Sequence, residues 1–487
     1  MFNAAEKSAL HVWLTHGLRL AATATLLVAA AVRLYAGDND ILTDCRRYLL
    51  AEGDEQEAVA ARIAGFDGKI GPIIEALSQP ATTAWQDQTG LLANQPFTDP
   101  PLQQPHADDL LHFFVPPAYT PSKPLGLLIF MHGGGRTTPR DHPRHVVSHP
   151  DVDRESYGLQ PHFADSKFII VAPSAPWNEK TGARWNVPSA DDYICDVIQE
   201  CSHRFNIDAD RIFLGGYSMG GFGAFHLCQR LNDRLAGAVV FSGAWKTTHW
   251  KSWTGLPVFM RHGKNDAVAP GTEGLRSRPR FTDVFYSRAA HQRLTELSID
   301  HLYVEDDGGH SLRGTADAMS QLPRWMEQYT RDAFASHVVA VSQRGWKSSS
   351  DTPTPHCRWV TISETGAEEM TFDAVEMKGP SPSFKETTEA FNAQTMQLGT
   401  GNVAAGLVDA RNEGNNHITV QTENVRRFSV WLHPSMVDFS RPVRISVNGK
   451  LSEHRITESL LDALRSYRRR HDWRLIYHAE IKLAVER

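Results

Sequence analysis

The sequence has no apolar segment long enough to cross a bilayer as a helix. The apolar run near its amino end covers residues 20–32, which is 13 residues, whereas a spanning helix needs ~20. Positive charge is not in excess either: 56 acidic residues outnumber 50 basic ones, and the formal net charge is −6. A nucleic-acid binder needs a basic stripe, and the basic trio Arg468–Arg470 is typical of a solvated helix face. We therefore expect neither a stable membrane span nor a nucleic-acid partner.

Cysteine is scarce, with five residues in a chain of 487. An odd number, at spacings that match no known framework, argues against a disulfide scaffold or a cysteine-bound metal. Cys195 and Cys201 lie six positions apart in an expected helix, which turns the two thiols to different faces and prevents a bridge. We expect all five cysteines to be free and buried: Cys45, Cys195, Cys201, Cys228 and Cys357.

A metal-binding pattern is also lacking. His142, His145 and His149 lie within eight residues, but Pro143 and Pro150 interrupt any helical face that would gather them. The chemistry that the rest of the sequence indicates needs no metal. We expect neither a metal nor a cofactor.

The amino-terminal apolar run has the features of an export signal. Basic residues precede it, its length fits the apolar part of a signal peptide, and Ala29–Ala31 offers a small-residue cleavage site. We expect residues 1–36 to be a signal peptide and the protein to be secreted or periplasmic. The alternative is an amphipathic or buried amino-terminal helix, because the preceding segment is long and Arg33 ends the run abruptly.

The remaining chain divides into three regions by composition. Residues 37–94 have helical patterns and form a small helical segment, and the proline-rich stretch from Leu91 to Pro105 is typical of a linker. Residues 95–335 alternate apolar strand-like runs with helical patterns. Residues 336–487 contain short β-rich runs separated by Gly, Asn and Pro, and end in a charged helix.

Near-continuous apolar runs mark the central region. Such runs are typical of parallel strands covered on both faces, and helical segments separate or follow them, the last interrupted at Pro323. The pattern predicts an α/β fold, a mostly parallel sheet with helices on both faces. The expected strands are 110–115, 125–131, 168–172, 211–214, 238–241, 258–260 and 301–305, and the expected helices include 191–205, 285–297 and 316–330.

One stretch organises this region: an apolar strand that begins at Arg211, a Gly216-Tyr-Ser218-Met-Gly220 turn and a helix-forming segment. A serine at the apex of such a tight turn has its hydroxyl forced into open space, and the two glycines are needed because side chains there would collide. Ser218 is the predicted nucleophile. The pentapeptide alone is a modest signal, and its weight comes from partners elsewhere in the chain.

A serine nucleophile needs a base, and the base needs an acid to orient it. His310 follows an expected strand on a glycine-containing loop and is the predicted base. Asp266 follows the preceding expected strand and is the predicted acid, so the chain order is Ser, Asp, His. Asp306 and Asp307 are the alternative acids, but they lie only a few residues before the histidine.

The reaction also needs donors for an oxyanion. One is the backbone N–H of Met219, directly after the serine, and the other is the N–H of Gly134 or Gly135, on a glycine loop directly after the strand that ends at Met131. Trp177 and Trp185 lie on a loop that follows a strand, and such loops line ligand crevices. These two rings are candidate substrate-binding residues for an aromatic or sugar group, although packing explains them equally well.

From about Leu110 to Thr330, about half of the chain, the sequence resembles the α/β-hydrolases. The likeness is greatest to the esterase group that contains polyhydroxybutyrate depolymerases, feruloyl esterases and acetyl xylan esterases. It implies hydrolysis of a carboxylic ester through an acyl-serine intermediate, without metal or cofactor, and it does not specify the ester. The motifs that carry it are His132-Gly-Gly-Gly135, Ala172-Pro173, Arg184-Trp185, Asp208 to Ile212, Gly216 to Gly221, His262 to Asp266 and Gly308-Gly-His310.

Together these patterns predict an exported serine esterase whose ester substrate is small or polymeric, the polymer being a polysaccharide ester or a polyester. Three alternatives stay open. A serine peptidase of the prolyl-oligopeptidase type and an acyltransferase would use the same triad. A binding module that has the fold without the chemistry is the alternative outside catalysis, and it gives no reason for a serine in a strained turn.

Overall fold

The computed structural model describes residues 40–485 with the exception of 80–84, 136, 142, 148–157, 181, 188, 269–270, 272–273, 313–315, 344–355 and 381–386. The expected signal peptide and two of the clustered histidines, His142 and His149, lie outside the described residues. The chain divides into two compact units, Met1–Thr82 with Glu458–Arg468 and Thr83–Thr457 with Arg469–Arg487. The central region and most of the β-rich region thus fall in one unit, and a domain boundary at residue 335 stays a prediction.

The smaller unit is helical in its described residues. A helix at residues 40–50 is followed by α2 (Gly53–Ala64) and α3 (Ile70–Ser78), and most of α12 (Leu460–Arg470) completes the unit. The Arg468 guanidinium donates to the carbonyls of Tyr48 (2.7 Å) and Ala51 (2.9 Å). Arg470, at the end of α12, is buried. The expectation that Arg468–Arg470 form a solvated face is therefore wrong, because two of the three cations bind within the fold.

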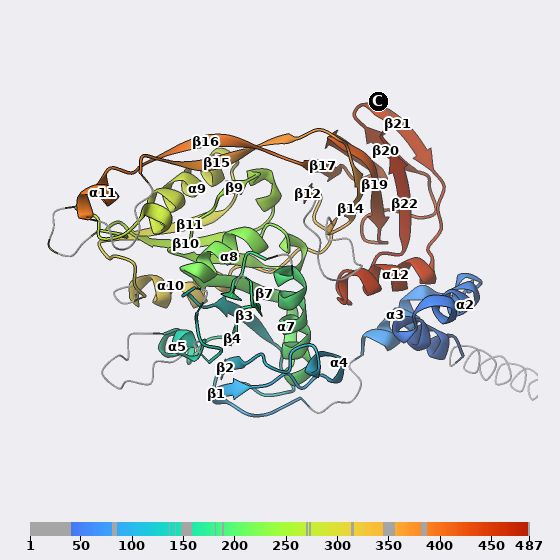
Figure 1. Cartoon of the computed structure of the whole chain (residues 1–487). Coiled ribbons are helices and arrows are strands. Elements are labelled where there is room, and N and C mark those ends of the chain that lie inside the picture. Colours follow the sequence, from blue (N-terminus) through green and yellow to red (C-terminus); the bar gives the residue numbers. More distant parts are fainter. Residues whose placement is uncertain are drawn as a thin grey trace, which may run out of the picture. The chain divides into compact units, whose positions relative to one another are not determined.

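An eight-stranded sheet is the centre of the larger unit (Figure 1). Only the second strand runs against its neighbours, and all pairs from the third strand onward are parallel. The strand order changes direction at β3, because the next strand along the chain lies on one side of it and β7 on the other. In spatial order the strands are β1 (Gly90–Gln95), β2 (Leu111–Val115), β4 (Phe168–Pro173), β3 (Leu125–Met131), β7 (Ile207–Tyr217), β8 (Gly237–Phe241), β10 (Val258–Gly263) and β11 (His301–Asp306).

All of these strands except β1 lie where apolar runs predict them. β1 occupies part of the expected linker, Leu91 to Pro105. It is an edge strand with a half-exposed pattern and is held by pairing with β2, so it has no apolar run that would reveal it. The expected interruption at Pro323 is also absent, since α10 (Ala316–Met326) continues through this residue.

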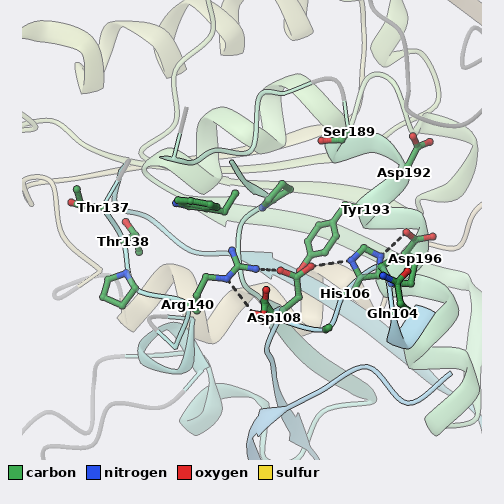
Figure 2. Close-up of a pocket in the computed structure, with 16 residues that line it drawn as sticks. Gln104, His106, Asp108, Thr137, Thr138, Arg140, Ser189, Asp192, Tyr193 and Asp196 are labelled. Carbon is green, nitrogen blue, oxygen red and sulfur yellow. Dashed lines mark hydrogen bonds and ion pairs between the residues drawn. The ribbon is translucent and has the colours of Figure 1, made fainter. Parts of the chain in front are cut away.

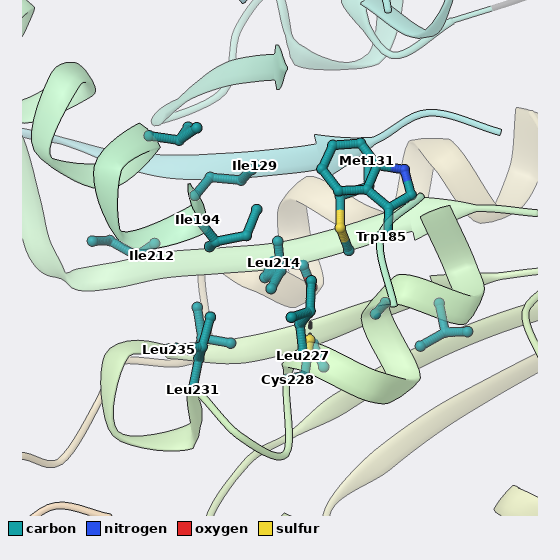
Figure 3. Close-up of a cluster of buried hydrophobic side chains, with 14 of the residues drawn as sticks. Ile129, Met131, Trp185, Ile194, Ile212, Leu214, Leu227, Cys228, Leu231 and Leu235 are labelled. Atoms are coloured by element: carbon teal, nitrogen blue, oxygen red, sulfur yellow. Dashed lines mark hydrogen bonds between the residues drawn. The ribbon is translucent and has the colours of Figure 1, made fainter. Parts of the chain in front are cut away.

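Helices cover both faces of the sheet. Successive strand residues point to opposite sides, so neighbouring residues of β3 show what covers each face. Ile129 and Met131 belong to one buried cluster, which Figure 3 shows against α7 (Ala190–Arg204) and α8 (Met219–Leu227). Phe130, between them, belongs to a second cluster with residues of α10.

Among the described residues, no helix combines the length and apolar character needed to cross a membrane. The other helices of this region are α4 (Pro100–Gln103), α5 (Arg144–Val147), α6 (Gln160–Phe163), α9 (Phe285–Glu296) and the 3-10 turns η2 (Asn232–Arg234), η3 (Trp250–Trp253) and η4 (Arg280–Thr282), and a small hairpin joins β5 (Trp177–Asn178) to β6 (Gly182–Ala183).

The expected β-rich region is built from two sheets. Both contribute to one buried cluster that includes Trp359 and Trp431. Asn448 and Gly449 form a tight hairpin turn, since both residues have the positive φ that such a turn requires. The five-stranded sheet has the order β12 (His337–Gln343), β17 (Ala405–Asn412), β18 (His417–Glu423), β20 (Val443–Val447) and β21 (Lys450–His454), and the four-stranded sheet β13 (His356–Cys357), β14 (Val360–Thr365), β19 (Val425–Leu432) and β22 (Ala479–Ala484).

A long hairpin, which we call the arm, leaves this β-rich region and pairs with a short strand that follows the eight-stranded sheet's β8. It consists of β15 (Met370–Lys378), the short helix α11 (Thr388–Asn392) and β16 (Thr395–Val403), shown in orange in Figure 1. β15 also pairs with β9 (Thr247–Thr248), which follows β8 of the large sheet. The sequence patterns did not predict the arm, because its exposed positions leave only short apolar stretches.

Candidate active site

The site lies where the strand order changes direction, which is where ligands bind in open α/β sheets. β3 ends at Met131 and leads into the glycine loop, and its neighbour β7 ends at Tyr217 and leads into Ser218. Because both strands are parallel, these two loops emerge side by side. The fold therefore brings together two predicted parts of the site that are 84 positions apart in the sequence, from Gly134 to Ser218.

Ser218 has a strained backbone, with φ of 56° and ψ of −116°. Its N–H donates to the carbonyl of Phe241 (3.0 Å), which ties the turn to β8. A Cβ on Gly220 would lie 2.0 Å from the carbonyl oxygen of Met131, and a Cβ on Gly216 would meet the backbone of Gly220 at 2.5 Å. These close approaches are the reason that glycine is needed on both sides of the serine.

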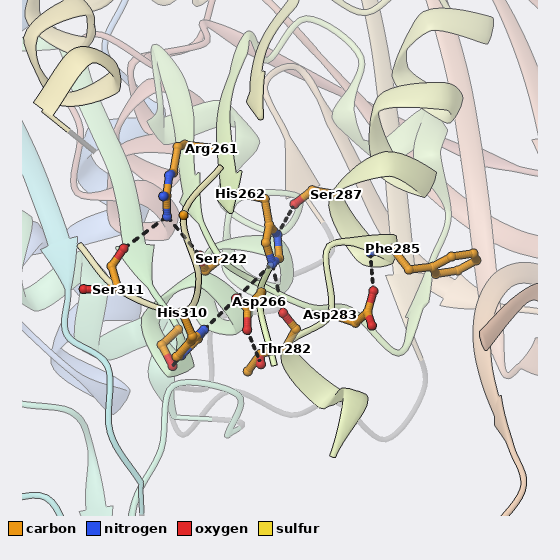
Figure 4. Close-up of polar contacts among 12 residues, drawn as sticks. Ser242, Arg261, His262, Asp266, Thr282, Asp283, Phe285, Ser287, His310 and Ser311 are labelled. Atoms are coloured by element: carbon orange, nitrogen blue, oxygen red, sulfur yellow. Dashed lines mark hydrogen bonds and ion pairs between the residues drawn. The ribbon is translucent and has the colours of Figure 1, made fainter. Parts of the chain in front are cut away.

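The structure brings Ser218, His310 and Asp266 together. His310 Nε2 lies 2.8 Å from Ser218 Oγ, and its Nδ1 lies 2.7 Å from Asp266 Oδ2. The polar contacts around Asp266 and His310 are drawn in Figure 4. This is the hydrogen-bond order that activates a serine, with the imidazole between hydroxyl and carboxylate.

The alternative acids, Asp306 and Asp307, bind other side chains. Asp306 receives two hydrogen bonds from the buried guanidinium of Arg261, at 2.6 and 2.7 Å. Asp307 is exposed and pairs with Lys264 (2.6 Å). Neither carboxylate is the one that binds His310 in this structure, which is Asp266.

Asp266 is buried, and several donors hold it. Besides His310, its carboxylate receives hydrogen bonds from His262 Nε2 (3.1 Å) and Thr282 Oγ1 (2.8 Å). Burial by itself would raise the pKa of Asp266, but the hydrogen bonds from His262 and His310 outweigh burial and hold this pKa well below its usual value. The Asp266 carboxylate is therefore ionised near neutral pH.

His262 and Thr282 are supporting residues that the sequence patterns did not assign. His262 Nε2 faces two acceptors, the Asp266 carboxylate and the carbonyl of Thr282 (2.9 Å), so this nitrogen carries the proton. Its Nδ1 then accepts from the Ser287 hydroxyl (2.8 Å). The only sequence signal for His262 is its position in the motif before Asp266, and Thr282 has no signal at all.

The glycine loop has a fixed shape around one candidate donor. Gly135 N–H donates to Thr138 Oγ1 (2.7 Å) and is therefore already used within the loop. Gly134 has a φ of 110°, which only glycine adopts easily, and the preceding Gly133 approaches Ser218 most closely. This geometry favours Gly134 over Gly135 as the partner of the Met219 N–H, which starts helix α8 beside the serine.

Trp185 does not line the site as expected. Its ring is fully buried, and its Nε1 donates to the carbonyl of His132 (3.0 Å) at the start of the glycine loop. His132 in turn accepts from Ala175 N–H through Nε2 (3.1 Å) and donates through Nδ1 to Gly133 (2.6 Å). A buried ring cannot stack on a ligand, so Trp185 supports the glycine loop through its hydrogen bond to His132.

A pocket of about 820 Å³ adjoins the glycine loop (Figure 2). Thr138, which holds Gly135, lies in its wall, and Trp177 lines it with 54% of its surface exposed. The role of Trp177 in substrate binding stays a prediction. Carboxylates outnumber permanent cations in the wall: the aspartates are Asp108, Asp109, Asp192 and Asp196, and the guanidinium is that of Arg140.

Several wall groups bind one another. Arg140 pairs with Asp109, and His106 lies between Asp109 (2.9 Å) and Asp196 (2.8 Å). The Tyr193 ring packs beside His106 at 5.3 Å between centroids. In the described parts of the chain, no group of three or more His, Cys, Asp or Glu side chains is arranged to hold a metal ion.

Comparisons with known proteins agree with this geometry. Residues 178–302, which include Ser218 and Asp266, match the model of the phospholipase/carboxylesterase family. The chain contains an α/β-hydrolase domain. The match covers part of the region that the large sheet and its helices form, and it ends before His310.

Two curated relatives of this α/β-hydrolase are esterases. A bifunctional acetylxylan esterase/xylanase of Neocallimastix patriciarum is 26% identical over 161 residues, 32% of this chain and 21% of that protein. Feruloyl esterase D of Neurospora crassa is 26% identical over 174 residues, 34% of this chain and 56% of that protein. The chain spans between about a fifth and about half of the length of these relatives.

Solved esterase structures overlap this chain only loosely. A ferulic acid esterase structure is 14% identical, with overlap of 50% of this chain and 98% of that one and a TM-score of 0.37. A thermostable esterase is 20% identical, with 50% and 63% overlap and the same TM-score of 0.37. Overlaps this loose carry no weight in the assignment, which rests on the strand order and the family match.

Proposed function

We propose that this protein hydrolyses carboxylic esters through an acyl-serine intermediate. The observation that carries the proposal is the hydrogen-bond chain from Ser218 to His310 to Asp266, beside a glycine loop at the carboxyl edge of the sheet. A purely structural role does not explain this combination. It joins a buried and ionised acid, a base bound at both ring nitrogens and a serine in a strained turn.

The geometry supports a definite sequence of proton transfers. Ser218 Oγ attacks the ester carbonyl as His310 Nε2 takes the hydroxyl proton, while Asp266 stabilises the imidazolium through Nδ1–H. The oxyanion of the tetrahedral intermediate accepts hydrogen bonds from the N–H groups of Met219 and Gly134. His310 then gives the proton to the leaving alcohol. A water repeats the cycle on the acyl-enzyme, with His310 again as the base, and releases the acid.

The decisive experiment compares the wild type with Ser218→Ala on p-nitrophenyl acetate and butyrate. Ser320→Ala is the matched control, because this serine is exposed on α10 and its hydroxyl donates only to a local carbonyl. We expect loss of turnover in Ser218→Ala alone. Equal rates in all three proteins would rule out the acyl-serine mechanism. An amide analogue and an added alcohol acceptor test the peptidase and acyltransferase alternatives in the same assay.

The proposed substrate class is a polysaccharide ester with a neutral, hydroxyl-rich alcohol part. An exposed Trp177 offers a face for a sugar ring, and the surplus of aspartates in the pocket disfavours an anionic group. The names of the relatives, acetylxylan esterase and feruloyl esterase, point the same way. Rates on acetylated xylan, methyl ferulate and a polyester would rank these substrates, and a preference for the polyester would reject the proposal.

Export remains part of the proposal, supported by the basic and apolar pattern of residues 1–36. Expression of the full-length chain in a secreting host, followed by mass measurement of the product, tests this point. A mature protein that begins between residues 30 and 37 is the expected result. An intact chain retained in the cell would contradict export.

A further inference from the structure

The arm of the β-rich region is fastened to the hydrolase at its midpoint. β15 pairs with β9 through Asp373 and Thr248, and Arg293 of α9 binds the Asp373 carboxylate (2.8 Å). Partly buried Val375 and Leu398 of the arm pack against the hydrolase core. A strand pairing, an ion pair and apolar contacts therefore fix the arm along its length, so its end reaches a defined place.

The end of the arm contacts the loop that contains Asp266, the proposed catalytic acid. Asn392, the last residue of α11, accepts the backbone N–H of Arg276 through Oδ1 (3.1 Å). Gln394, just before β16, accepts the backbone N–H of Arg280 through Oε1 (3.2 Å). Gln394 is 3% exposed, so its amide is a built-in part of the fold and not a surface group that bends over by chance.

One of the two N–H groups belongs to a residue that binds Asp266, and the other lies two residues before such a residue. The Arg276 side chain donates to the Asp266 carbonyl (3.2 Å), and Thr282, two residues after Arg280, donates to Asp266 Oδ1 (2.8 Å). Both arginines also bind the buried carboxylate of Asp283, at 2.6 and 3.1 Å. Figure 4 shows Thr282 and Asp283 beside Asp266 and His310.

The loop needs outside support because it has little regular structure of its own. Between β10 and α9 the described residues contain only the short turn η4 and an isolated bridge between Val268 and Arg276. Backbone N–H groups in such a segment need acceptors from elsewhere. Asn392 and Gln394 are those acceptors for Arg276 and Arg280.

We propose that Asn392 and Gln394 are positioning residues for the catalytic acid, and that the arm is therefore part of the catalytic apparatus. The inference rests on the proposed function, because it assigns a role through Asp266. By holding the backbone of Arg276 and Arg280, the arm keeps the Thr282 hydroxyl on Asp266 Oδ1. The other oxygen, Oδ2, then stays aimed at His310 Nδ1. Loss of this hold lets the carboxylate turn, and the imidazolium of the transition state loses stabilisation.

The test replaces the acceptor oxygens with little change in side-chain size. Gln394→Leu and Asn392→Leu, alone and together, remove the acceptors, while Gln394→Glu and Asn392→Asp keep an acceptor oxygen. Gln397→Leu is the matched control: it makes the same replacement on β16, where the amide donates to Glu376 (2.8 Å) across the hairpin. The measurements are kcat and KM for p-nitrophenyl acetate against pH, with active enzyme counted by fluorophosphonate titration.

The expected result separates positioning from folding. The double Leu variant loses about 10-fold in kcat per active site, since a small misplacement of a catalytic group has effects of that order, and its KM stays within about two-fold. The acid limb of its pH–rate profile moves to lower pH, because a misaligned carboxylate stabilises the protonated base less. The acceptor-keeping variants recover kcat to within about three-fold, and Gln397→Leu matches the wild type.

Two results would overturn the proposal. The first is a double Leu variant with unchanged kcat per active site and unchanged pH profile, which would make the arm a packing element. The second is an equal loss of kcat in the acceptor-keeping variants, which would show that the oxygens are irrelevant. Neither result touches the proposed function, because Ser218→Ala decides that point separately on the same substrate.

Discussion

Asp266 shows at the scale of one residue how neighbouring carboxylates acquire different roles. It and Asp306 come from adjacent strands of the sheet and are both bound by strong donors. Asp266 is bound by two imidazoles and a hydroxyl, which leaves an oxygen aimed at His310. Asp306 is bound on both oxygens by the buried Arg261 guanidinium, which makes it a structural counter-ion.

Replacement of the two aspartates should therefore have opposite effects. Asp266→Asn should lower kcat by about 10⁴-fold with little change in KM, because an amide favours the wrong imidazole tautomer. Asp306→Asn should keep most of kcat and lower the free energy of unfolding by about 2 kcal/mol, because Arg261 loses a charged acceptor. Steady-state kinetics and urea unfolding of both variants make the comparison. A large loss of kcat in Asp306→Asn would mean that the acid has been misassigned.

His433 is a second residue whose surroundings make a pH prediction. Burial, helped by the nearby His478, lowers the pKa of His433 to about 4. Its Nδ1 accepts the backbone N–H of Ser435 (3.1 Å), and its ring stacks on Phe334 at 4.2 Å, so protonation would disrupt the site. An unfolded histidine has a pKa of about 6.5. Stability is therefore complete above this pH and falls as the pH drops toward 4, since the unfolded chain binds the proton more readily.

The measurement for His433 is the urea midpoint at pH 7.5 and at pH 5. The wild type should lose stability between these values, and His433→Asn should lose less, because asparagine keeps an acceptor for Ser435 without titrating. The urea midpoint of His433→Asn at pH 7.5 is the reference for the same variant at pH 5. An identical pH dependence in both proteins would mean that other groups cause the acid sensitivity.

At the scale of elements, the unit formed by β3, β7 and α8 is defined by close backbone contact. The Gly220 Cα lies so near the end of β3 that an added Cβ would sit 2.0 Å from the Met131 carbonyl oxygen. The Gly220 Cα and the Met131 carbonyl oxygen both belong to rigid backbone, so neither can move without a large cost in free energy. The shape of the serine turn is thus determined by the packing of its backbone against β3.

Gly220→Ala should lower the free energy of unfolding by about 3 kcal/mol, the upper range for overpacking, and should abolish most activity by displacing Ser218. Gly71→Ala is the control, because its added Cβ meets nothing within 4 Å and it lies in helix α3. Chemical denaturation of the two variants and the wild type is the measurement. A Gly220→Ala protein of normal stability would show that the turn relaxes more easily than its contacts suggest.

At the scale of the whole larger unit, buried charges join segments far apart in the chain. Arg331, between α10 and β12, donates to Asp210 of β7 (2.7 Å), to the Asp233 carbonyl (3.0 Å) and to Asp472 (2.6 Å). Asp472 follows α12 near the carboxyl end of the chain. The hydrolase sheet and the carboxyl-terminal segment thus share one buried cation, in addition to the contacts that the arm makes.

Arg331→Met should therefore lower the free energy of unfolding by about 3–5 kcal/mol, since it leaves the buried Asp472 without its main partner. The control is Arg288→Met, which breaks an exposed pair with Glu305 and should cost at most about 1 kcal/mol. Calorimetry should show one transition for the wild type and a split transition for Arg331→Met. A single, unshifted transition would mean that the charges contribute little to the joint.

Much of this protein was determined by local sequence. Buried parallel strands need continuous apolar runs, so β3, β4 and β8 could be predicted directly, and a serine turn needs its two glycines, so Ser218 stood out. His310 and Asp266 followed from their positions after strands. Each of these signals is local because the physical requirement, burial on both faces or room at a tight turn, acts on a few consecutive residues.

Tertiary structure decided the rest. β1 exists only through its pairing with β2, and Trp185 became a support of the glycine loop because its ring is enclosed by the sheet and α7. Asn392 and Gln394 bind the acid loop across 116 and 114 positions of sequence, and Thr282 binds Asp266 across 16. Hydrogen bonds between such distant segments depend on where whole elements lie, and no short pattern of residues records that.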